Sequence, residues 1–266
     1  VTGFKVGQKV FGFTLFGGCA SHLVVSPHQL APIPKGWSLE ACAALPTTTM
    51  TALHALHNLA HIQSGHTVLV QSAAGGVGMA LCQLARHAGC HVVSVVGNAS
   101  KIQTALKAGA HTVFVRSPQL WRHVDAAYPN GFDAVLDACG VSTLRPSFER
   151  LKPMGNLVVY GFAEVFPRKL PALLPFLAYN YLRIPSFSPW DMTATNRSVH
   201  GFNLAFLEQH TDVGIALLQH VATLAQQGHL QPPPLTVFPV DAVAEAYHYV
   251  ASGDSVGKTI LTFEHE

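Results

Sequence analysis

The spacing of apolar residues changes its period along the chain. Residues 9–13 and 21–25 alternate between apolar and polar positions, which predicts two short strands. Between residues 39 and 59 apolar side chains recur every three or four positions, which predicts a helix. After Gly65 the pattern changes again, to a regular succession of buried strands and amphipathic helices.

This succession predicts one parallel sheet that is covered by helices on both faces. Apolar runs indicate strands at residues 67–71, 91–96, 112–115, 134–137 and 156–160, with a sixth at 199–202. Helical spacing indicates helices at residues 77–88, 101–108, 121–127 and 143–151. The expected fold class is therefore α/β, with a doubly wound parallel Rossmann sheet.

The end of the chain does not continue this succession. A helix expected at residues 213–227 is followed by the break Gln231-Pro-Pro-Pro234, and then by a strand (236–238), a helix (243–252) and a strand (258–263). We assign this tail to the same small domain as the first residues of the chain. The expected division is 1–45 with 231–266 for the small domain, and 46–230 for the sheet domain.

A glycine-rich turn, Ala73-Ala74-Gly75-Gly76-Val77-Gly78, lies between the first strand of the sheet and the helix that follows it. At such a turn Gly75 lets the backbone approach a pyrophosphate, and Gly78 lets the helix pack closely on the sheet. The free N–H groups at the helix start then face the phosphates. Ala73 replaces the first glycine of the usual pattern, and an ordinary tight turn is the alternative. The strands and helices around it favour a dinucleotide-binding site.

The end of the second strand indicates which dinucleotide binds. Enzymes that use NAD place an acid there for the ribose 2′-hydroxyl, but no Asp or Glu occurs between Glu40 and Asp125. Ser100 and Lys101 are suited to a 2′-phosphate, and Arg116 follows the third strand on the same side. A solvated lysine at a helix start is the alternative for Lys101. The sequence therefore predicts NADPH as the cofactor.

Composition excludes several other classes of protein. The chain of 266 residues is 49% hydrophobic and 11% charged, which suits a globular protein with a large core. A formal net charge of +2 gives no reason to expect nucleic-acid binding. The five cysteines are scattered and odd in number, which indicates free thiols in a reducing, cytoplasmic compartment.

The chain shows neither a signal peptide nor a transmembrane segment. It begins at Val1 inside a strand-like segment, so we expect the amino-terminal part of a longer protein to be missing. No apolar run reaches the roughly 18 residues that span a bilayer.

Several segments resemble a known family. Residues 68–86, around the glycine turn, look like the quinone oxidoreductase branch of the medium-chain dehydrogenase/reductases. Residues 43–56 match the helix before the family's Rossmann unit, and residues 257–261 match its last strand. Residues 151–161 and 196–202 resemble a subgroup, the vesicle amine transport protein (synaptic vesicle membrane protein) homologues.

The resemblance implies a GroES-like β domain, here partial and made from both chain ends, beside the Rossmann domain. It implies a homodimer and puts activity in doubt, because the family's amino-terminal part has no counterpart here. Gly161 and Phe162 follow the fifth strand, where the nicotinamide is expected. The other positions that match cofactor contacts are Thr51, Ala74, Gly75, Gly76, Val77, Gly97, Lys101, Arg116, Phe202, Asn203 and Lys258.

We expect no metal site. Zinc-dependent relatives commonly carry a cysteine ligand at the start of the helix before the Rossmann unit, where this chain has residues 45–49, Leu-Pro-Thr-Thr-Thr. His54, His57 and His61 share one helix face, and a polar outer face is the expected explanation. Hydride transfer needs no protein nucleophile, so the sequence identifies no catalytic residue.

The segment 166–190 is rich in prolines and aromatic residues and carries Arg168, Lys169 and Arg183. We expect it to form a lid over the substrate or a dimer contact. Weak peripheral binding to a membrane surface is the alternative.

The expected function is that of an NADPH-dependent, zinc-independent oxidoreductase that reduces quinones or other conjugated carbonyls. An enoyl-thioester reductase is one alternative, because the glycine turn also resembles enoyl reductase modules of polyketide synthases. A catalytically silent NADP-binding protein, acting at membranes or in a complex, is the other.

Overall fold

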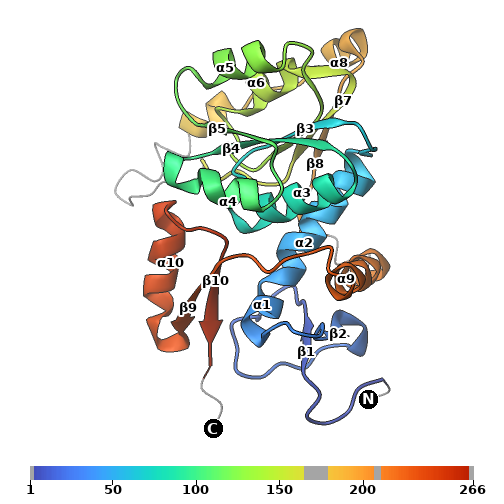
Figure 1. Ribbon diagram of the computed structural model, residues 1–266, viewed down its shortest axis with the longest axis vertical. Helices are drawn as coiled ribbons and strands as arrows, with labels where there is room; N and C mark the ends of the chain where they lie inside the picture. The colour runs from blue at the N-terminus through green and yellow to red at the C-terminus, as the bar shows by residue number, and fades with distance from the viewer. Residues whose placement is uncertain (1–2, 165–178, 207–210, 264–266) are drawn as a thin grey trace.

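The computed structural model describes residues 3–164, 179–206 and 211–263. A six-stranded sheet with helices on both faces forms one lobe, and segments from both ends of the chain form a second lobe below it (Figure 1). Among the described residues, no helix has both the length and the apolar character needed to cross a membrane.

The large sheet is parallel throughout, as expected from the alternating pattern. In spatial order its strands are β5 (Thr112–Val115), β4 (His91–Val96), β3 (Thr67–Val70), β6 (Phe132–Asp137), β7 (Leu151–Val159) and β8 (Ser198–Gly201). The order in which the chain adds strands reverses between β3 and β6. In such sheets ligands bind beyond the carboxyl ends of the strands at this point.

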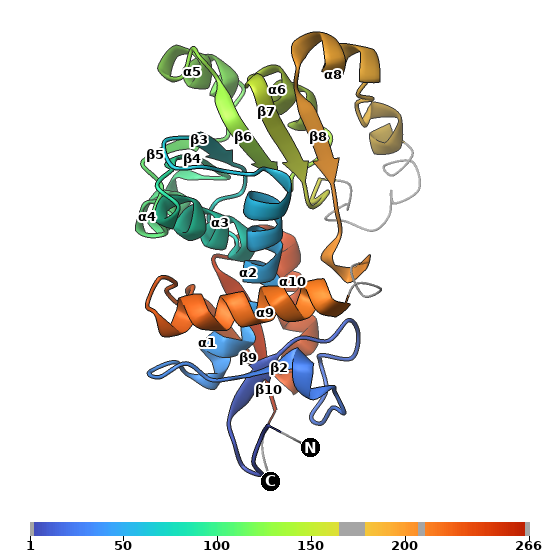
Figure 2. The same cartoon turned by 90° about the vertical axis from the view of Figure 1, so that its right-hand side faces the viewer.

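Successive side chains along a strand point to opposite faces of the sheet and pack into two separate cores. Val68 and Val70 of β3 belong to a core shared with α2 (Leu45–Leu53) and α3 (Gly76–His87). Leu69 belongs to the other core, under α5 (Leu120–Ala127) and α6 (Leu144–Glu149). Both faces of β3 are thus buried, which explains its continuous apolar sequence. Figure 2 shows these helices on opposite sides of the sheet.

The helix expected at residues 39–59 is divided into three parts. These are α1 (Leu39–Ala43), α2 and a π-helical segment η2 (His54–Leu59). The side chain of Ser38 caps α1 by accepting a hydrogen bond from the amide of Ala41. The break at Ala44 has a physical cause, because Pro46 has no N–H to donate to the carbonyl of Cys42.

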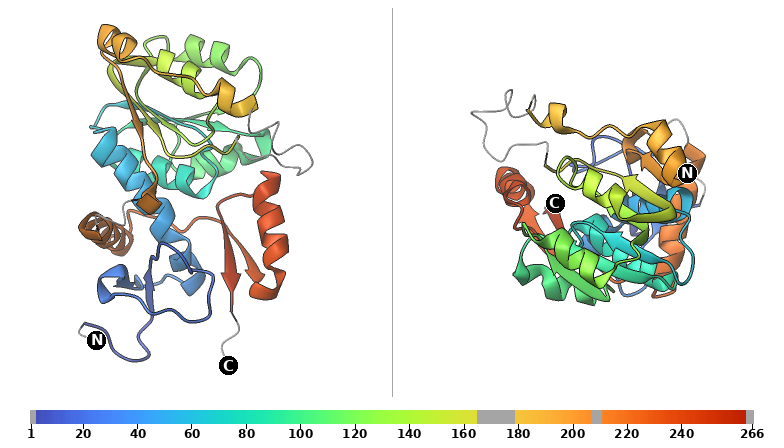
Figure 3. Two further views of the ribbon diagram at one scale, coloured as in Figure 1. Left: turned by 180° about the vertical axis from the view of Figure 1, so that it is seen from behind. Right: turned by 90° about the horizontal axis from the view of Figure 1, so that it is seen from above.

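The second lobe contains two small sheets. β1 (Val10–Gly12) pairs with β2 (Leu30–Pro32) in antiparallel fashion, and β9 (Leu235–Pro239) pairs with β10 (Lys258–Thr262) in parallel. Helix α10 (Val243–Ser252) packs on β9 and β10, and α9 (Thr211–Gln226) crosses between the lobes (Figure 2). Figure 3 shows from behind that α10 and its two strands stand apart from β1 and β2.

The prediction of a strand at residues 21–25 is wrong. This segment is not in a strand, and Val24 is fully exposed. Its alternation resembles a strand, but a strand also needs a neighbour for its backbone hydrogen bonds, and residues 30–32 take that place beside β1. Residues 166–178 of the expected lid lie outside the described residues.

The remaining described elements are short. They are η1 (Pro27–Gln29), η3 (Ala99–Lys101), α4 (Ile102–Lys107), α8 (Pro189–Thr195) and η6 (Val240–Ala242).

Candidate functional site

The glycine turn joins β3 to α3 at the point where the strand order reverses. Ser72 has a positive φ of 53°, and its carbonyl oxygen accepts a hydrogen bond of 3.0 Å from the amide of Gly75. A Cβ atom at Gly78 would overlap that same carbonyl and lie 2.7 Å from the Cα of Ala73. Only glycine therefore lets α3 begin so close to the strand.

The amino end of α3 faces the returning tail of the chain. The amide of Gly257 donates a 3.0 Å hydrogen bond to the carbonyl of Ala74, and Gly75 and Gly257 form an isolated β-bridge. Ala74 to Val77 surround this helix start, whose first amides have no partner within the helix. Such a helix start favours a negatively charged ligand.

Lys258 places a positive charge beside this helix start. Its Cδ atom lies 3.7 Å from where a Cβ of Gly76 would be. Burial lowers the pKa of Lys258, and its ammonium group makes no hydrogen bond or ion pair with any residue that the structure describes. A half-buried cation without a counter-charge is suited to hold an anionic group such as a phosphate.

The end of β4 gives a second, open part of the site. A Cβ atom at Gly97 would meet nothing within 4 Å, so ligand atoms have room there. The hydroxyl of Ser100 donates to the side-chain oxygen of Asn98 at 2.6 Å. Lys101 is buried, and its Nζ donates to the carbonyl oxygens of Gly253 at 2.8 Å and Ser255 at 2.9 Å. Lys101 is thus not a solvated lysine.

Arg116 points across the carboxyl ends of the strands. Its Nη2 donates to Gln71 Oε1 at 3.3 Å and to Cys139 Sγ at 2.8 Å, and its Nη1 lies 3.8 Å from Glu164 Oε1. Gln71 follows β3, and Cys139 and Glu164 lie beyond the ends of β6 and β7. The arginine therefore contacts residues on both sides of the point where the strand order reverses, between β3 and β6.

This polar cluster carries unused donors. Within the described part of the chain, Arg116 Nε and Gln71 Nε2 are buried and have no hydrogen-bond partner. A buried donor without an acceptor is costly, so an acceptor atom of a ligand would stabilise both. Gln71, Cys139 and Glu164 were not predicted as site residues, although each lies at or just after the end of a predicted strand, and this position was a signal that could have identified them.

Asp137 anchors the loop that follows β6. It is fully buried, and its carboxylate accepts hydrogen bonds from the amides of Cys139 and Gly140 and from the hydroxyls of Thr143 and Ser147. Burial raises the pKa of Asp137, and these donors oppose the shift. The contacts fix the start of α6 and hold Cys139 at the sheet edge. Asp137, the last residue of β6, was not predicted as a site residue either.

The residues expected near the nicotinamide follow β7 and β8. A Cβ atom at Gly161 would lie 3.4 Å from Ala138, and Phe162 is partly exposed. The amide of Phe202 donates to the carbonyl of Val159 at 3.1 Å. Asn203 is used locally, because its side-chain oxygen accepts from the amide of Ala205. All four expected positions thus lie at the same edge of the sheet as the glycine turn.

Helix α2 lies beside this edge. Thr51 donates its hydroxyl to the carbonyl of Thr47 at 2.6 Å, so this hydroxyl is used within the helix. The ring of His54, just beyond α2, lies 4.8 Å from the ring of Phe202. Lys258 begins β10 of the second lobe, whereas Lys101 and Arg116 follow β4 and β5 along the chain.

The histidines of α2 and η2 do not gather around one point. His57 faces His220 of α9, with ring centroids 6.2 Å apart, while His54 faces Phe202. Among the described residues, no group of three or more His, Cys, Asp or Glu side chains has a geometry that could hold a metal ion.

Four histidines with shifted pKa values predict that acid destabilises the fold. Burial lowers the pKa of His54, His57, His111 and His200 below the ordinary value of 6.5, and neighbouring positive charges add to the shift for all but His54. The unfolded chain then binds more protons than the folded one below pH 6.5, so stability is lost as the pH falls through this range. We expect the midpoint of thermal unfolding to be a few degrees lower at pH 5.5 than at pH 7.5.

Differential scanning calorimetry at the two pH values measures this change. Replacing His57 and His111 by glutamine should flatten part of the dependence, because a histidine contributes to it only where folding changes its pKa. A midpoint that rises on acidification would contradict the assignment.

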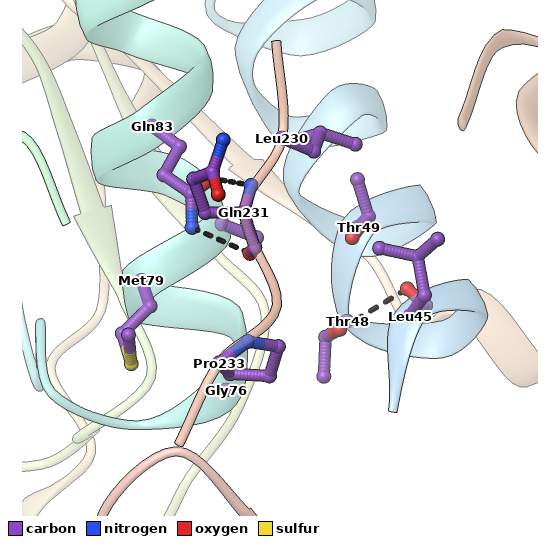
Figure 4. A pocket seen from close by; sticks show the side chains of 10 residues that line it. Leu45, Thr48, Thr49, Gly76, Met79, Gln83, Leu230, Gln231 and Pro233 are labelled. Carbon is purple, nitrogen blue, oxygen red and sulfur yellow. Dashed lines mark hydrogen bonds between the residues drawn. The ribbon is translucent and has the colours of Figure 1, made fainter. Parts of the chain in front are cut away.

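A small cavity of about 10 Å³ lies between α2, α3 and residues 230–233 (Figure 4). Beside it, the amide side chain of Gln83 both donates to and accepts from the backbone of Gln231, at 3.2 Å and 2.7 Å. This volume suits one water molecule rather than a substrate. The pair of hydrogen bonds instead ties α3 to the segment that leads to β9.

Comparison with known proteins agrees with this geometry. The family described as zinc-binding dehydrogenase matches residues 76–208. A synaptic vesicle membrane protein VAT-1 homolog from Danio rerio is 32% identical over 99% of this chain, and the match covers 54% of that protein. The chain therefore spans about half the length of this relative.

Two solved structures have the same arrangement over nearly the whole chain. The CurK enoyl reductase is 26% identical, with a TM-score of 0.82 over 99% of this chain and 74% of that one. The quinone oxidoreductase from Thermus thermophilus, also described in complex with NADPH, is 26% identical, with a TM-score of 0.77 over 96% of this chain and 76% of that one. With its six-stranded parallel sheet and glycine turn, the chain belongs to the zinc-binding dehydrogenase family within the medium-chain dehydrogenase/reductase superfamily of oxidoreductases, close to the VAT-1 homologues.

Proposed function

We propose that this chain binds NADPH and passes its hydride to quinones or other conjugated carbonyls, without zinc. The observation that carries the proposal is the cation of Lys258 beside the amide groups at the start of α3, next to a β4 end without acids. Lys258 lies unpaired at the start of α3 among the described residues, and Gly97 leaves open space at the end of β4. The similarity to a quinone oxidoreductase with bound NADPH supports the same conclusion.

The chain's own residues would bind and orient the cofactor. The amides at the start of α3 and the ammonium of Lys258 would hold the diphosphate. Gly97 and Ser100 would border the 2′-phosphate, since no carboxylate is there to repel it. Phe162 and Phe202, after β7 and β8, would limit water at the nicotinamide end. The bound dinucleotide itself supplies the hydride.

The proposal that zinc is not needed depends on which possible zinc ligands α2 offers. The stretch Thr47 to Thr49 offers hydroxyls where zinc-dependent relatives commonly have a cysteine, and two of these threonines are buried. Thr48 gives its hydroxyl to the carbonyl of Ala44 at 2.8 Å. Activity should therefore survive dialysis against a chelator.

A single assay tests the proposed function. The purified chain is mixed with NADPH and a benzoquinone, and the loss of nicotinamide absorbance is followed over time. We expect oxidation of NADPH with quinone, slower oxidation of NADH, and no change after treatment with a chelator. Equal or faster turnover of NADH would contradict the NADPH assignment.

A second candidate is reduction of enoyl thioesters. The similarity to the CurK enoyl reductase favours it, because that structure has the higher TM-score of the two compared above. A crotonyl thioester in the same assay distinguishes the two substrates. NADPH binding without turnover of either substrate would instead favour a silent cofactor-binding protein.

A further inference from the structure

The side chain of Arg116 lies across the carboxyl ends of the strands. Arg116 directly follows β5 at one edge of the sheet, whereas Cys139 follows β6, three strands away in the spatial order. Its Nη2 nevertheless lies 2.8 Å from Cys139 Sγ, and it also reaches Gln71 just after β3. Ligands of such sheets bind beyond the strand ends where the order reverses, here between β3 and β6. The guanidinium therefore occupies part of this binding region itself.

Glu164 holds the guanidinium in this position. Its carboxylate accepts hydrogen bonds from the hydroxyl and the amide of Ser142, at 2.6 and 2.9 Å, and its Oε1 lies 3.8 Å from Arg116 Nη1. The backbone fixes Glu164 as well, because its amide donates to the carbonyl of Cys139 at 3.0 Å. Arg116 and Glu164 thus connect the segments that follow β5, β6 and β7.

The contact between Arg116 and Glu164 is suited to open and close. At 3.8 Å the two groups attract each other by charge, but they are too far apart for a hydrogen bond. Their side chains are 34% and 27% exposed, so water competes for both charges. With the pair closed, Arg116 Nε and Gln71 Nε2 are buried without an acceptor among the described residues, which disfavours this state. A ligand that brings acceptor atoms can therefore displace it.

We propose that Arg116 and Glu164 form an autoinhibitory latch, which covers the strand ends between β3 and β6 and must open before a dinucleotide can bind. The inference rests on the proposed dinucleotide binding, and it concerns the free chain. Only the open fraction of the molecules can then bind, so the apparent Kd exceeds the intrinsic Kd by the inverse of that fraction. The latch slows association and leaves the rate of dissociation unchanged.

Glu164→Gln tests the latch, since it removes the charge but keeps an acceptor for Ser142. The variant and the unaltered chain are mixed with NADPH or NADH by stopped flow, and binding is followed by nicotinamide fluorescence. We expect association to be about two- to fivefold faster with both dinucleotides, the change that an ion pair of this exposure supports. Dissociation should not change. Ser142→Ala, which removes one donor that holds Glu164, should give a smaller change in the same direction.

A matched variant separates the latch from a general effect of charge. Both dinucleotides are anionic, so removal of any nearby carboxylate speeds their approach. Asp254→Asn removes an exposed carboxylate between Gly253 and Ser255, whose carbonyls contact Lys101 beyond the end of β4. It should speed association less than Glu164→Gln does. Equal effects of the two variants would mean charge repulsion alone and would overturn the inference.

Chemical modification gives a readout without cofactor. Phenylglyoxal reacts with accessible guanidinium groups, and mass spectrometry of peptides measures the rate at each arginine. Arg116 should react several-fold faster in Glu164→Gln than in the unaltered chain, because Glu164 no longer holds it. Arg122, an exposed residue of α5, is the internal reference and should react at the same rate in both. An unchanged rate at Arg116 would overturn the inference.

Failure of the proposed function is a separate outcome. If the unaltered chain binds neither dinucleotide, the proposed function fails, and the phenylglyoxal experiment still decides whether Glu164 holds Arg116 in the free chain. Slower association with Glu164→Gln would show instead that Glu164 supports the bound state, which excludes a latch.

Discussion

Gly78→Ala should lower the free energy of unfolding by about 3 kcal/mol or more, because the site has no room for a methyl group. The added Cβ would overlap the carbonyl oxygen of Ser72 and lie 2.7 Å from the Cα of Ala73. Both contacts are to backbone atoms, so no side-chain rotation relieves them. The start of α3 would have to move away from the sheet, and its first amide groups, which we propose bind the diphosphate, would move with it. Urea denaturation followed by circular dichroism measures the change.

Gly97→Ala is the matched control for this prediction. A Cβ atom there would meet nothing within 4 Å, and the backbone φ of Gly97 is not positive. Its stability should stay within about 0.5 kcal/mol of the unaltered chain. If the cofactor binds over this residue as proposed, the Kd for NADPH should still rise. Equal stability of the Gly78→Ala and Gly97→Ala variants would contradict the close packing of α3 on the turn.

Asp137→Ala should destabilise the chain by about 4 kcal/mol, since it leaves several buried donors without an acceptor. The amides of Cys139 and Gly140 and the hydroxyls of Thr143 and Ser147 all donate to this carboxylate. Asp137 is fully buried, so solvent water does not reach the site to replace the lost carboxylate as a hydrogen-bond acceptor. The loop after β6 would loosen, and with it the contact between Cys139 and Arg116. Chemical denaturation measures the loss of stability.

Asp125→Ala gives the comparison with an exposed carboxylate. Asp125 accepts from Arg150 at 2.6 and 2.7 Å, but its side chain is 53% exposed. Exposed ion pairs contribute little, so this variant should lose about 1 kcal/mol or less. A loss as large for Asp125→Ala as for Asp137→Ala would mean that burial does not decide the effect.

The sequence predicted those strands best that are buried on both faces. Residues 91–96 and 112–115 form β4 and β5 with the predicted limits. Both segments are rich in β-branched residues, which favour strands. The strand expected from residue 156 begins at Leu151, and Pro153 and Gly155 within it are residue types that are uncommon inside strands. The strand accommodates them by an irregular register opposite β6 and a positive φ of 70° at Met154. Such local irregularity is set by the neighbouring strand rather than by the sequence alone.

The candidate site was predictable where it depends on backbone shape. The position of the glycine turn could be predicted, because the spacing of its glycines indicates where a helix packs closely against a strand. The partners of Lys101 were not predictable. They are the backbone carbonyls of Gly253 and Ser255, which are 152 and 154 positions away in the sequence. Every residue has a carbonyl, so the sequence does not indicate which one accepts the hydrogen bond. The contacts of the Arg116 side chain could not be predicted for a similar reason. Its acceptors Gln71 and Cys139 follow different strands, β3 and β6, and only the strand order brings them together.

The attachment of Lys101 to the α10–β10 loop also has a consequence for folding kinetics. The contact closes a segment of 152 residues, whereas each strand–helix–strand unit of the large sheet forms from residues close in sequence. Closing so long a segment costs more entropy than closing a short one, and non-local contacts form slowly. During refolding, the secondary structure of the Rossmann lobe should therefore return before Lys101 reaches the carbonyls of Gly253 and Ser255.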